Sequence, residues 1–291
     1  MLSTSQGLLY LRSTLKTKNL IGPIGVFDSG YGGLTVLKEI RNRLPQYDYL
    51  YLGDNARSPY GNRSFDVVYE YTLEAVKELF ARGCPLVILA CNTASAKALR
   101  TIQQIDLPLL APENRVLGVI RPSTEVIGAI TKTGHVGVLA TEGTVRSESY
   151  VIELHKFSPD TRVVQQACPM WVPLIETGNY LTEAGKLFIQ ADVDALLQQD
   201  PKIDVIVLGC THYPLIGDYI QSIVPEGIQV VAQGPIVAEK LETYLNIHHE
   251  LESRCAKDGK IHFLTSENTE VFNSKAKGFL GIEIFSEHVH F

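Results

Sequence analysis

Two cysteines stand in matched positions along the chain. Cys91 follows the apolar run LVILA (86–90), and Cys210 follows the apolar run VIVLG (205–209). A helix is expected to begin after each cysteine. A thiolate at a helix N-terminus has a lowered pKa, which makes it useful as a base or a nucleophile.

Polar residues follow both cysteines. Asn92 and Thr93 follow the first, and Thr211 and His212 follow the second. The other three cysteines, Cys84, Cys168 and Cys255, lack this context, and we interpret them as structural.

Three kinds of chemistry use such thiols. A structural zinc site needs about four ligands, and the spacing of Cys210 and His212 is poor for chelation, with no CxxC motif in the chain. Acyl transfer needs one cysteine and a base such as His212, but it gives the second cysteine no role. Inversion at a carbon needs a base on one face and an acid on the other, so it uses both thiols. The pair therefore favours proton transfer, and the substrate stays open at this point.

Two glycine-containing loops carry further polar groups. The loop DSGYGG (28–33) places three glycines between an expected strand and an expected helix, at a spacing that matches neither dinucleotide-binding nor P-loop motifs. Its backbone N–H groups can converge on a carboxylate, and Ser29 adds a hydroxyl. Asp28 is alternatively a loop or helix cap. The segment GDNARSPYG (53–61), taken alone, predicts a turn around Tyr60.

The elements that position these residues alternate between strands and helices. Short β-branched apolar runs are typical of strands buried on both faces. Apolar residues at three-to-four spacing predict helices over 35–43 and 65–82. The alternation predicts an α/β fold with mainly parallel sheets. The expected strands span residues 24–27, 49–53, 86–90, 116–120, 136–140, 163–167 and 205–209.

An internal repeat predicts two similar domains. Residues 24–35 align with 136–147, and 87–95 align with 205–213, although short V-I-L-G patterns also recur by chance in α/β proteins. A length of 291 residues suits two average domains. We expect two pseudo-symmetric α/β domains with the active site in the cleft between them, where the strands end. The first domain spans 21–114, with 226–291 returning to it, the second spans 115–225, and 1–20 forms a flexible extension.

The composition of the chain argues against some classes of binding partner and of cellular location. The net charge of −6 argues against nucleic acid, and no apolar run approaches the ~20 residues that span a bilayer. The first 20 residues lack the features of a secretory signal, and five cysteines without tight spacing fit a reduced, cytoplasmic chain.

Four segments together resemble the signature segments of the glutamate racemases, in the cofactor-independent aspartate/glutamate racemase superfamily. They are DSGYGG, GDNARSPYG, ACNTAS and LGCTHYPL, in this order, and VGVLATEGTVRSESY and CPMWVPLIETG are also similar. The resemblance runs from Ile21 to at least Tyr219. It implies two α/β domains around a pseudo-twofold axis and interconversion of L- and D-glutamate without pyridoxal phosphate or metal. D-glutamate would feed peptidoglycan synthesis, and hence cell wall biogenesis and cell shape, in the bacterial cytoplasm.

The resemblance also implies roles for individual residues. Cys91 and Cys210 are expected to be the two acid/base thiols, and Asp28, Glu176 and His212 are expected to tune or relay protons at them. It implies a homodimer and, in relatives with an N-terminal extension, activation by a cell-wall precursor. The residues expected to contact or orient substrate are Asp28, Ser29, Tyr60, Gly61, Asn92, Thr93, Thr211 and His212.

Two positions depart from the pattern of these racemases. Ser123 follows Pro122 where we expect a glycine, and residues 232–234 read Ala-Gln-Gly where Asp-Ser-Gly is common. Neither departure touches the cysteine motifs, so we expect altered contacts behind the site or at the domain interface.

Three rival interpretations remain open from the sequence. Another member of the superfamily, such as an aspartate racemase or a related thiol isomerase or decarboxylase, would differ in pocket size or in using one thiol. A catalytically silent binding protein would keep the cleft without turnover. A Cys-His hydrolase predicts a covalent adduct at Cys210 and indifference to the loss of Cys91.

Overall fold

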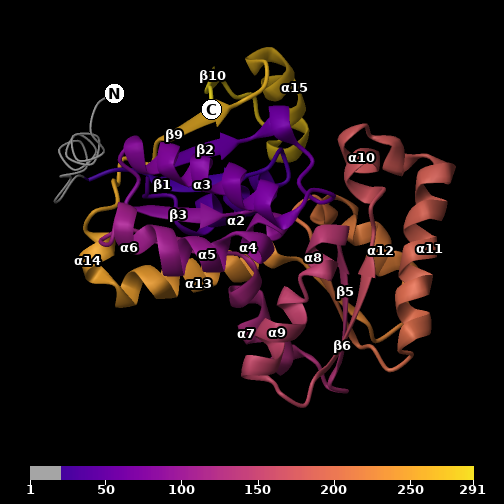
Figure 1. The fold of residues 1–291 in the computed structure, drawn as a ribbon. Coiled ribbons are helices and arrows are strands. Elements are labelled where there is room, and N and C mark those ends of the chain that lie inside the picture. The colour runs from indigo at the N-terminus through magenta and orange to yellow at the C-terminus, as the bar shows by residue number, and fades with distance from the viewer. Residues whose placement is uncertain (1–20) are drawn as a thin grey trace.

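The computed structural model describes residues 21–291 and folds them around two β-sheets (Figure 1). The predicted extension, residues 1–20, lies outside the described residues. The first sheet has six strands in the order β10-β9-β2-β1-β3-β4, and the second has four in the order β6-β5-β7-β8. Every strand pair is parallel, which confirms the predicted fold class. The strands are β1 (Ile24–Asp28), β2 (Tyr49–Gly53), β3 (Leu86–Leu89), β4 (Arg115–Gly118), β5 (His135–Ala140), β6 (Arg162–Ala167), β7 (Val205–Gly209), β8 (Gln229–Val231), β9 (Ile261–Thr265) and β10 (Ser286–His288).

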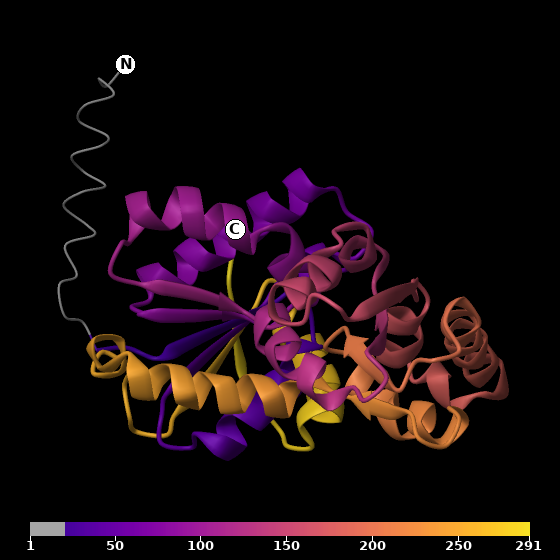
Figure 2. The same ribbon diagram turned by 90° about the horizontal axis from the view of Figure 1, so that it is seen from below.

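Helices cover both faces of the first sheet, and Figure 2 shows α13, in orange, running along one side of its strands. The two helices predicted over 35–43 and 65–82 are present as α2 and α3. The α-helices are α2 (Gly33–Arg43), α3 (Phe65–Ala81), α4 (Asn92–Lys97), α5 (Leu99–Thr101), α6 (Leu107–Leu110), α7 (Ile120–Ile130), α8 (Glu142–Arg146), α9 (Ser149–Phe157), α10 (Trp171–Glu176), α11 (Glu183–Gln199), α12 (Gly217–Ile223), α13 (Gln233–Ile247), α14 (His249–Glu252) and α15 (Thr269–Leu280). Shorter helical turns are η1 (Asn55–Arg57), η2 (Ile102–Asp106), η3 (Asn179–Leu181) and η4 (Tyr213–Ile216).

The repeat in the sequence appears as a repeat in topology. The order β2-β1-β3-β4 in the first sheet matches the order β6-β5-β7-β8 in the second. Strands β3 and β7, which precede the two matched cysteines, therefore occupy equivalent places. Both thiols follow the carboxyl end of a parallel strand, where open α/β sheets bind ligands.

Two strands lie in a different sheet from the one that the expected boundaries imply. β4 pairs with β3, so residues 115–118 belong to the first sheet, although we expected the second domain to begin at residue 115. β8 pairs with β7, so residues 229–231 belong to the second sheet, although we expected the return at residue 226. Pairing with a neighbouring strand decides membership of a sheet, and the apolar pattern of a short strand does not reveal its partner.

Apolar packing joins the two halves. One cluster of buried side chains includes Val26 from β1 and Leu139 and Leu208 from β5 and β7, so it extends across both sheets. Among residues 21–291, none of the helices combines the length and apolar character that a bilayer span requires.

Candidate active site

A cavity of about 160 Å³ lies where strands of both sheets end. It is smaller than the ~300–1,000 Å³ pockets that hold drug-sized ligands, so it suits a small substrate. Asp28 and Glu176 stand behind its wall rather than in it. The predicted residues that line it are Ser29, Tyr60, Gly61, Cys91, Asn92, Thr93, Cys210, Thr211 and His212.

Cys91 caps the N-terminus of α4 and is 5% exposed. Its Sγ lies 3.4 Å from the Ser29 hydroxyl and accepts the Ala94 N–H at 3.4 Å. Burial and the nearby Asp28 carboxylate nevertheless raise the pKa of this thiol to about 12. The expectation that helix capping lowers its pKa is therefore wrong, because desolvation outweighs two weak hydrogen bonds. Cys91 is a thiol at neutral pH.

Cys210 has a different set of neighbours. Its Sγ lies 3.9 Å from Nδ1 of His212, and Nε2 of His212 lies 2.9 Å from Oε1 of Glu176. Burial favours the neutral imidazole, but the contacts with Cys210 and Glu176 override it and raise the pKa of His212 to about 10. The ring is therefore a cation at neutral pH, with both nitrogens donating. The expected helix after Cys210 starts only at Tyr213, as η4 followed by α12, so the neighbour of the Cys210 sulfur is the His212 imidazolium and not a helix N-terminus.

Asp28 lies at the carboxyl end of β1 and is buried. It accepts the Gly30 N–H at 2.9 Å and faces the Thr211 hydroxyl of the other half at 3.5 Å. Burial raises its pKa, and the charge of His212 opposes that rise. Asp28 thus connects the surroundings of the two thiols.

The glycines of the DSGYGG loop make room for this contact between the halves. A Cβ on Gly32 would stand 2.4 Å from both Nδ1 of His212 and Oγ1 of Thr211. Next to it, Thr35 donates its hydroxyl to the Thr211 carbonyl at 2.8 Å. Residues 28–35 therefore fix the position of the loop that carries Cys210.

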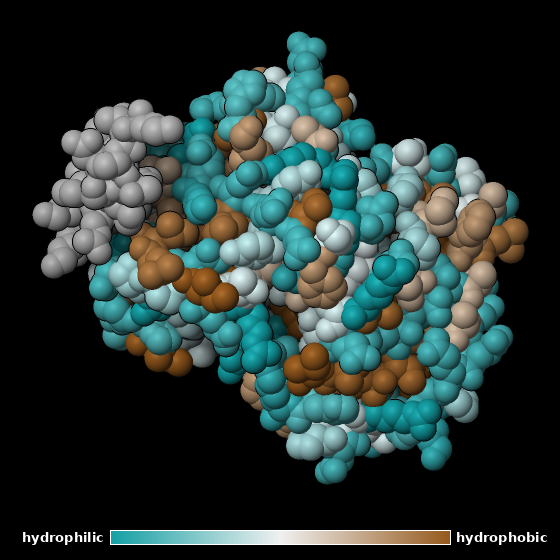
Figure 3. Space-filling model, in the orientation of Figure 1, coloured by the Kyte–Doolittle hydropathy of each residue, from teal (hydrophilic) through white to brown (hydrophobic). Residues whose placement is uncertain are grey.

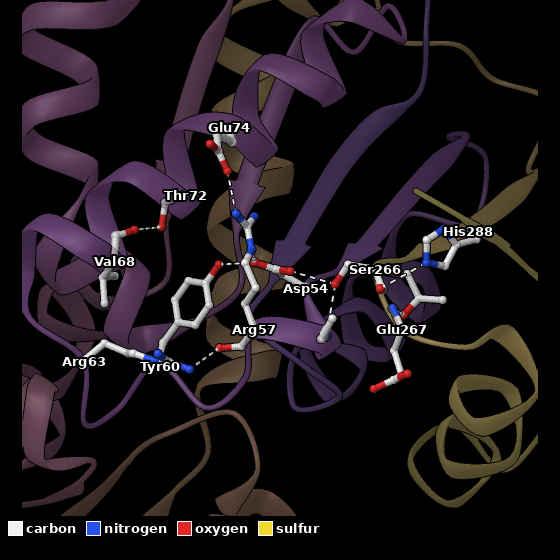
Figure 4. Close-up of polar contacts among 12 residues, drawn as sticks. Asp54, Arg57, Tyr60, Arg63, Val68, Thr72, Glu74, Ser266, Glu267 and His288 are labelled. Carbon is white, nitrogen blue, oxygen red and sulfur yellow. Dashed lines mark hydrogen bonds and ion pairs between the residues drawn. The ribbon is translucent and has the colours of Figure 1, made fainter. Parts of the chain in front are cut away.

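Tyr60 turns its hydroxyl away from the cavity. It donates to Oδ2 of Asp54 at 2.5 Å, and Asp54 also accepts from Arg57 at 2.6 Å and from Ser266 at 2.7 Å (Figure 4). Burial and Asp54 raise the pKa of the phenol well above its usual range. Tyr60 and Gly61 therefore offer a ring and backbone groups to a ligand, and Asp54 fixes them. Asp54 could not be identified from the sequence beyond its place in a turn.

Thr93 and Thr141 meet across the cleft. Their hydroxyl oxygens are 3.0 Å apart, and Thr141 caps α8 and lines the cavity. We did not predict Thr141 as a site residue. It aligns with Ser29 in the internal repeat, so pursuing that alignment to the residue would have found it.

In the part of the chain that the structure describes, the lining is rich in hydroxyl, amide and backbone donors, and its one cationic side chain is His212. Such donors bind carboxylates while leaving the thiols able to hold or release a proton. Within residues 21–291 no group of three or more His, Cys, Asp or Glu is arranged to hold a metal ion. The arrangement can carry acid/base chemistry on a small anionic substrate.

Comparison with known families matches residues 29–241 to the model described as Asp/Glu/Hydantoin racemase. A curated glutamate racemase of Geobacter metallireducens is 40% identical over 259 residues, which cover 89% of this chain and 92% of that protein.

Solved structures agree with this similarity. Glutamate racemase RacE1 of Bacillus anthracis superposes with a TM-score of 0.80 at 33% identity, covering 92% of this chain and 97% of that one. The enzyme of Francisella tularensis, solved with D-glutamate, gives 0.79 at 29% identity, with coverage of 94% and 98%. The Escherichia coli enzyme, solved with L-glutamate and the activator UDP-MurNAc-ala, gives 0.68 at 26% identity, with coverage of 91% and 97%.

Proposed function

The chain belongs to the Asp/Glu/hydantoin racemase family and groups with its glutamate racemases, and from this premise we propose that Cys91 and Cys210 exchange the α-proton of glutamate between them. It is an isomerase that produces D-glutamate. One observation carries the two-thiol mechanism: equivalent strands of two sheets deliver two thiols to one small cavity.

The proton transfers balance without a further reactant. A thiolate removes the α-proton, and the electron pair of the C–H bond moves into the neighbouring carboxylate. The other thiol then gives its proton to the opposite face of the carbon and becomes a thiolate. Each turnover therefore leaves the two thiols with exchanged protonation states, and the reverse reaction restores them.

The surroundings of the two thiols differ. The His212 imidazolium, held by Glu176, lies beside the Cys210 sulfur and can donate to it. The raised pKa of Cys91 favours a thiol there. We propose that the free enzyme begins with Cys210 as base and Cys91 as acid, with Asp28 coupling the two.

Hydroxyl, amide and backbone groups around the cavity are proposed to hold the substrate carboxylates. Their position in a small, mostly buried space supports this role, since donors in a water-excluded site act more strongly than in water. The groups come from Ser29, the Tyr60–Gly61 loop, Asn92, Thr93, Thr141, Thr211 and His212.

Five further features belong to the proposal. The activity needs neither pyridoxal phosphate nor metal, and D-glutamate supplies peptidoglycan synthesis in the cytoplasm. We propose two domains, 21–118 with 232–291 and 119–231, from the pairing of their strands. A homodimer is supported by exposed apolar side chains such as Leu187 and Phe188 of α11, where Figure 3 shows hydrophobic surface at the right-hand edge. A cell-wall precursor is proposed as an activator, as its presence in the E. coli structure suggests.

The test is proton exchange on L-glutamate in D2O, without added cofactor, followed by proton NMR and circular dichroism. We expect the α-proton signal and the optical activity to decay. Cys91→Ser and Cys210→Ser should each slow racemisation by about 10²- to 10⁴-fold, the usual contribution of a general acid or base. Cys255→Ser, at a buried cysteine that does not line the cavity, is the matched control. Full activity in either catalytic variant would contradict the mechanism.

The same assay separates the rivals. Exchange with aspartate but not glutamate would move the chain to a sister activity. Silence with both, even after cell-wall precursors are added, would favour a binding role. A covalent adduct at Cys210 that survives the loss of Cys91 would favour a hydrolase.

A further inference from the structure

The two departures from the racemase pattern meet in space. Nε2 of Gln233, the first residue of α13, lies 3.0 Å from the hydroxyl of Ser123 in α7. Gln233 is 2% exposed, so its amide needs partners inside the protein. Two changes more than 100 positions apart thus form one contact.

Gln233 also joins the two connections between the sheets. In the described chain, the first connection leaves β4 through Val119, and the second leaves β8 through Ala232 and Gln233. Nε2 of Gln233 donates to the Val119 carbonyl at 3.1 Å, so the amide links one connection directly to the other. A change in the angle between the halves has to strain or break this link.

The other end of the amide reaches the catalytic cleft. Oε1 of Gln233 accepts from Nδ2 of Asn92 at 2.7 Å, and Asn92 directly follows Cys91. The Tyr150 hydroxyl donates to Oδ1 of Asn92 at 2.8 Å and lies 2.6 Å from Nε2 of Gln233. Asn92, Tyr150 and Gln233 therefore form a closed, buried ring of hydrogen bonds that fixes the orientation of both amides.

We propose that Gln233 is a positioning residue of the racemase reaction, which holds the two inter-sheet connections together and orients Asn92 beside Cys91. This inference rests on the proposed function. An amide suits the place because it accepts from Asn92 at one end and donates to the Val119 carbonyl at the other. A shorter side chain such as serine would not reach α4, α7 and α9 together.

The variant Gln233→Met keeps the length of the side chain and removes its hydrogen bonds. We expect kcat/KM for glutamate to fall by about 10- to 100-fold, since misplacement by about 1 Å can cost 10²-fold. The matched control is Gln221→Met, which removes bonds to Ile228 and Val230 beside β8 but lies outside the ring. It should leave kcat/KM within about twofold.

Tyr150→Phe provides a second variant, which keeps the aromatic side chain in place and removes only its hydroxyl. If the three residues act as one unit, Gln233→Met and Tyr150→Phe combined should cost little more than the worse single variant. Costs that multiply would overturn the proposal, because independent structural roles add in free energy.

Hydrogen exchange followed by mass spectrometry tests the link without turnover. In Gln233→Met, amides of both connections, 119–124 and 233–238, should exchange faster together, while Gln221→Met leaves them unchanged. If the wild type does not racemise glutamate but Gln233→Met still shows this coupled change in exchange, the proposed function is refuted and the link between the two connections is retained. Unchanged exchange, or kcat/KM within twofold of the wild type, would refute the positioning role.

Discussion

Glu176→Gln tests what sets the protonation state of the Cys210 side. Gln keeps an oxygen that accepts from Nε2 of His212 and removes only the negative charge. The contact is 2.9 Å long, with side-chain exposures of 6% for His212 and 20% for Glu176. The variant therefore changes electrostatics with little change in packing.

The magnitude follows from that geometry. A hydrogen bond to a charged partner contributes about 1.5–3 kcal/mol and a neutral one about 0.5–1.5 kcal/mol, so losing the carboxylate charge costs about 1.2 kcal/mol, the difference between the two mid-range values. That corresponds to about one pKa unit. The pKa of His212, about 10 in the wild type, should fall by about one unit. At pH 10, kcat/KM should fall by about fivefold, because the charged fraction of His212 drops from about a half to about a tenth, whereas at pH 8 the ring stays mostly charged in both proteins.

The sign of the pH dependence is fixed by the direction of the shift. The pKa of His212 is raised from 6.5 to about 10, so its charge stabilises the fold fully below pH 6.5 and no longer does so above pH 10. The free energy of unfolding of Glu176→Gln should therefore be lower than that of the wild type at pH 7. The difference should vanish above pH 10, where His212 is neutral in both proteins.

The assay is kcat/KM against pH in both directions, with urea unfolding at pH 7 and above pH 10. L- and D-glutamate have equal free energies in water, so kcat/KM must fall equally in both directions, which is an internal check. Glu183→Gln, which removes an exposed ion pair with Lys186, is the control and should change neither quantity. A high-pH limb that stays in place, with kcat/KM at pH 10 within twofold of the wild type, would refute the role of Glu176.

Two further predictions concern residues that hold the walls of the cavity. Gly32→Ala should lower kcat/KM by about 100-fold with a smaller loss of stability, because the added methyl group displaces His212 and Thr211. Circular dichroism of the folded variant separates the loss of activity from the loss of stability. Unchanged kinetics would contradict the close approach of Gly32 to these two residues. Asp54→Asn should lower the free energy of unfolding, measured by urea titration, by about 2 kcal/mol, because Tyr60 loses its charged acceptor. It should also raise KM more than it lowers kcat. An unchanged KM would show that the Tyr60 loop does not need Asp54.

The sequence predicted those parts of the molecule that local pattern controls. Apolar runs located the central strands, and the repeat anticipated the matching strand orders and the meeting of Cys91 with Cys210. It did not reveal that β4 and β8 each stay with the preceding strand, because pairing between strands is a tertiary property. The domain boundaries that we propose from the two sheets therefore differ from those expected from the sequence.

Long-range contacts account for the residues that sequence reasoning missed. Asp54 acts on the cavity through Tyr60, and Ser266, which donates to Asp54, is more than 200 positions away. Gln233 and Ser123 looked like unrelated departures until the fold brought them together. The raised pKa of Cys91 depends on burial and on Asp28, neither of which follows from a cysteine at a helix N-terminus.

The most direct test of the two-thiol account is the position of deuterium in the early phase of racemisation in D2O. A thiol holds a single proton, so the base that takes the α-proton cannot be the acid that completes the product. We predict that newly formed D-glutamate carries deuterium at Cα while the remaining L-glutamate stays protiated. D-glutamate that retains the substrate proton, or an L-glutamate pool that gains deuterium as fast as D-glutamate forms, would show that one group serves both faces and would contradict the account.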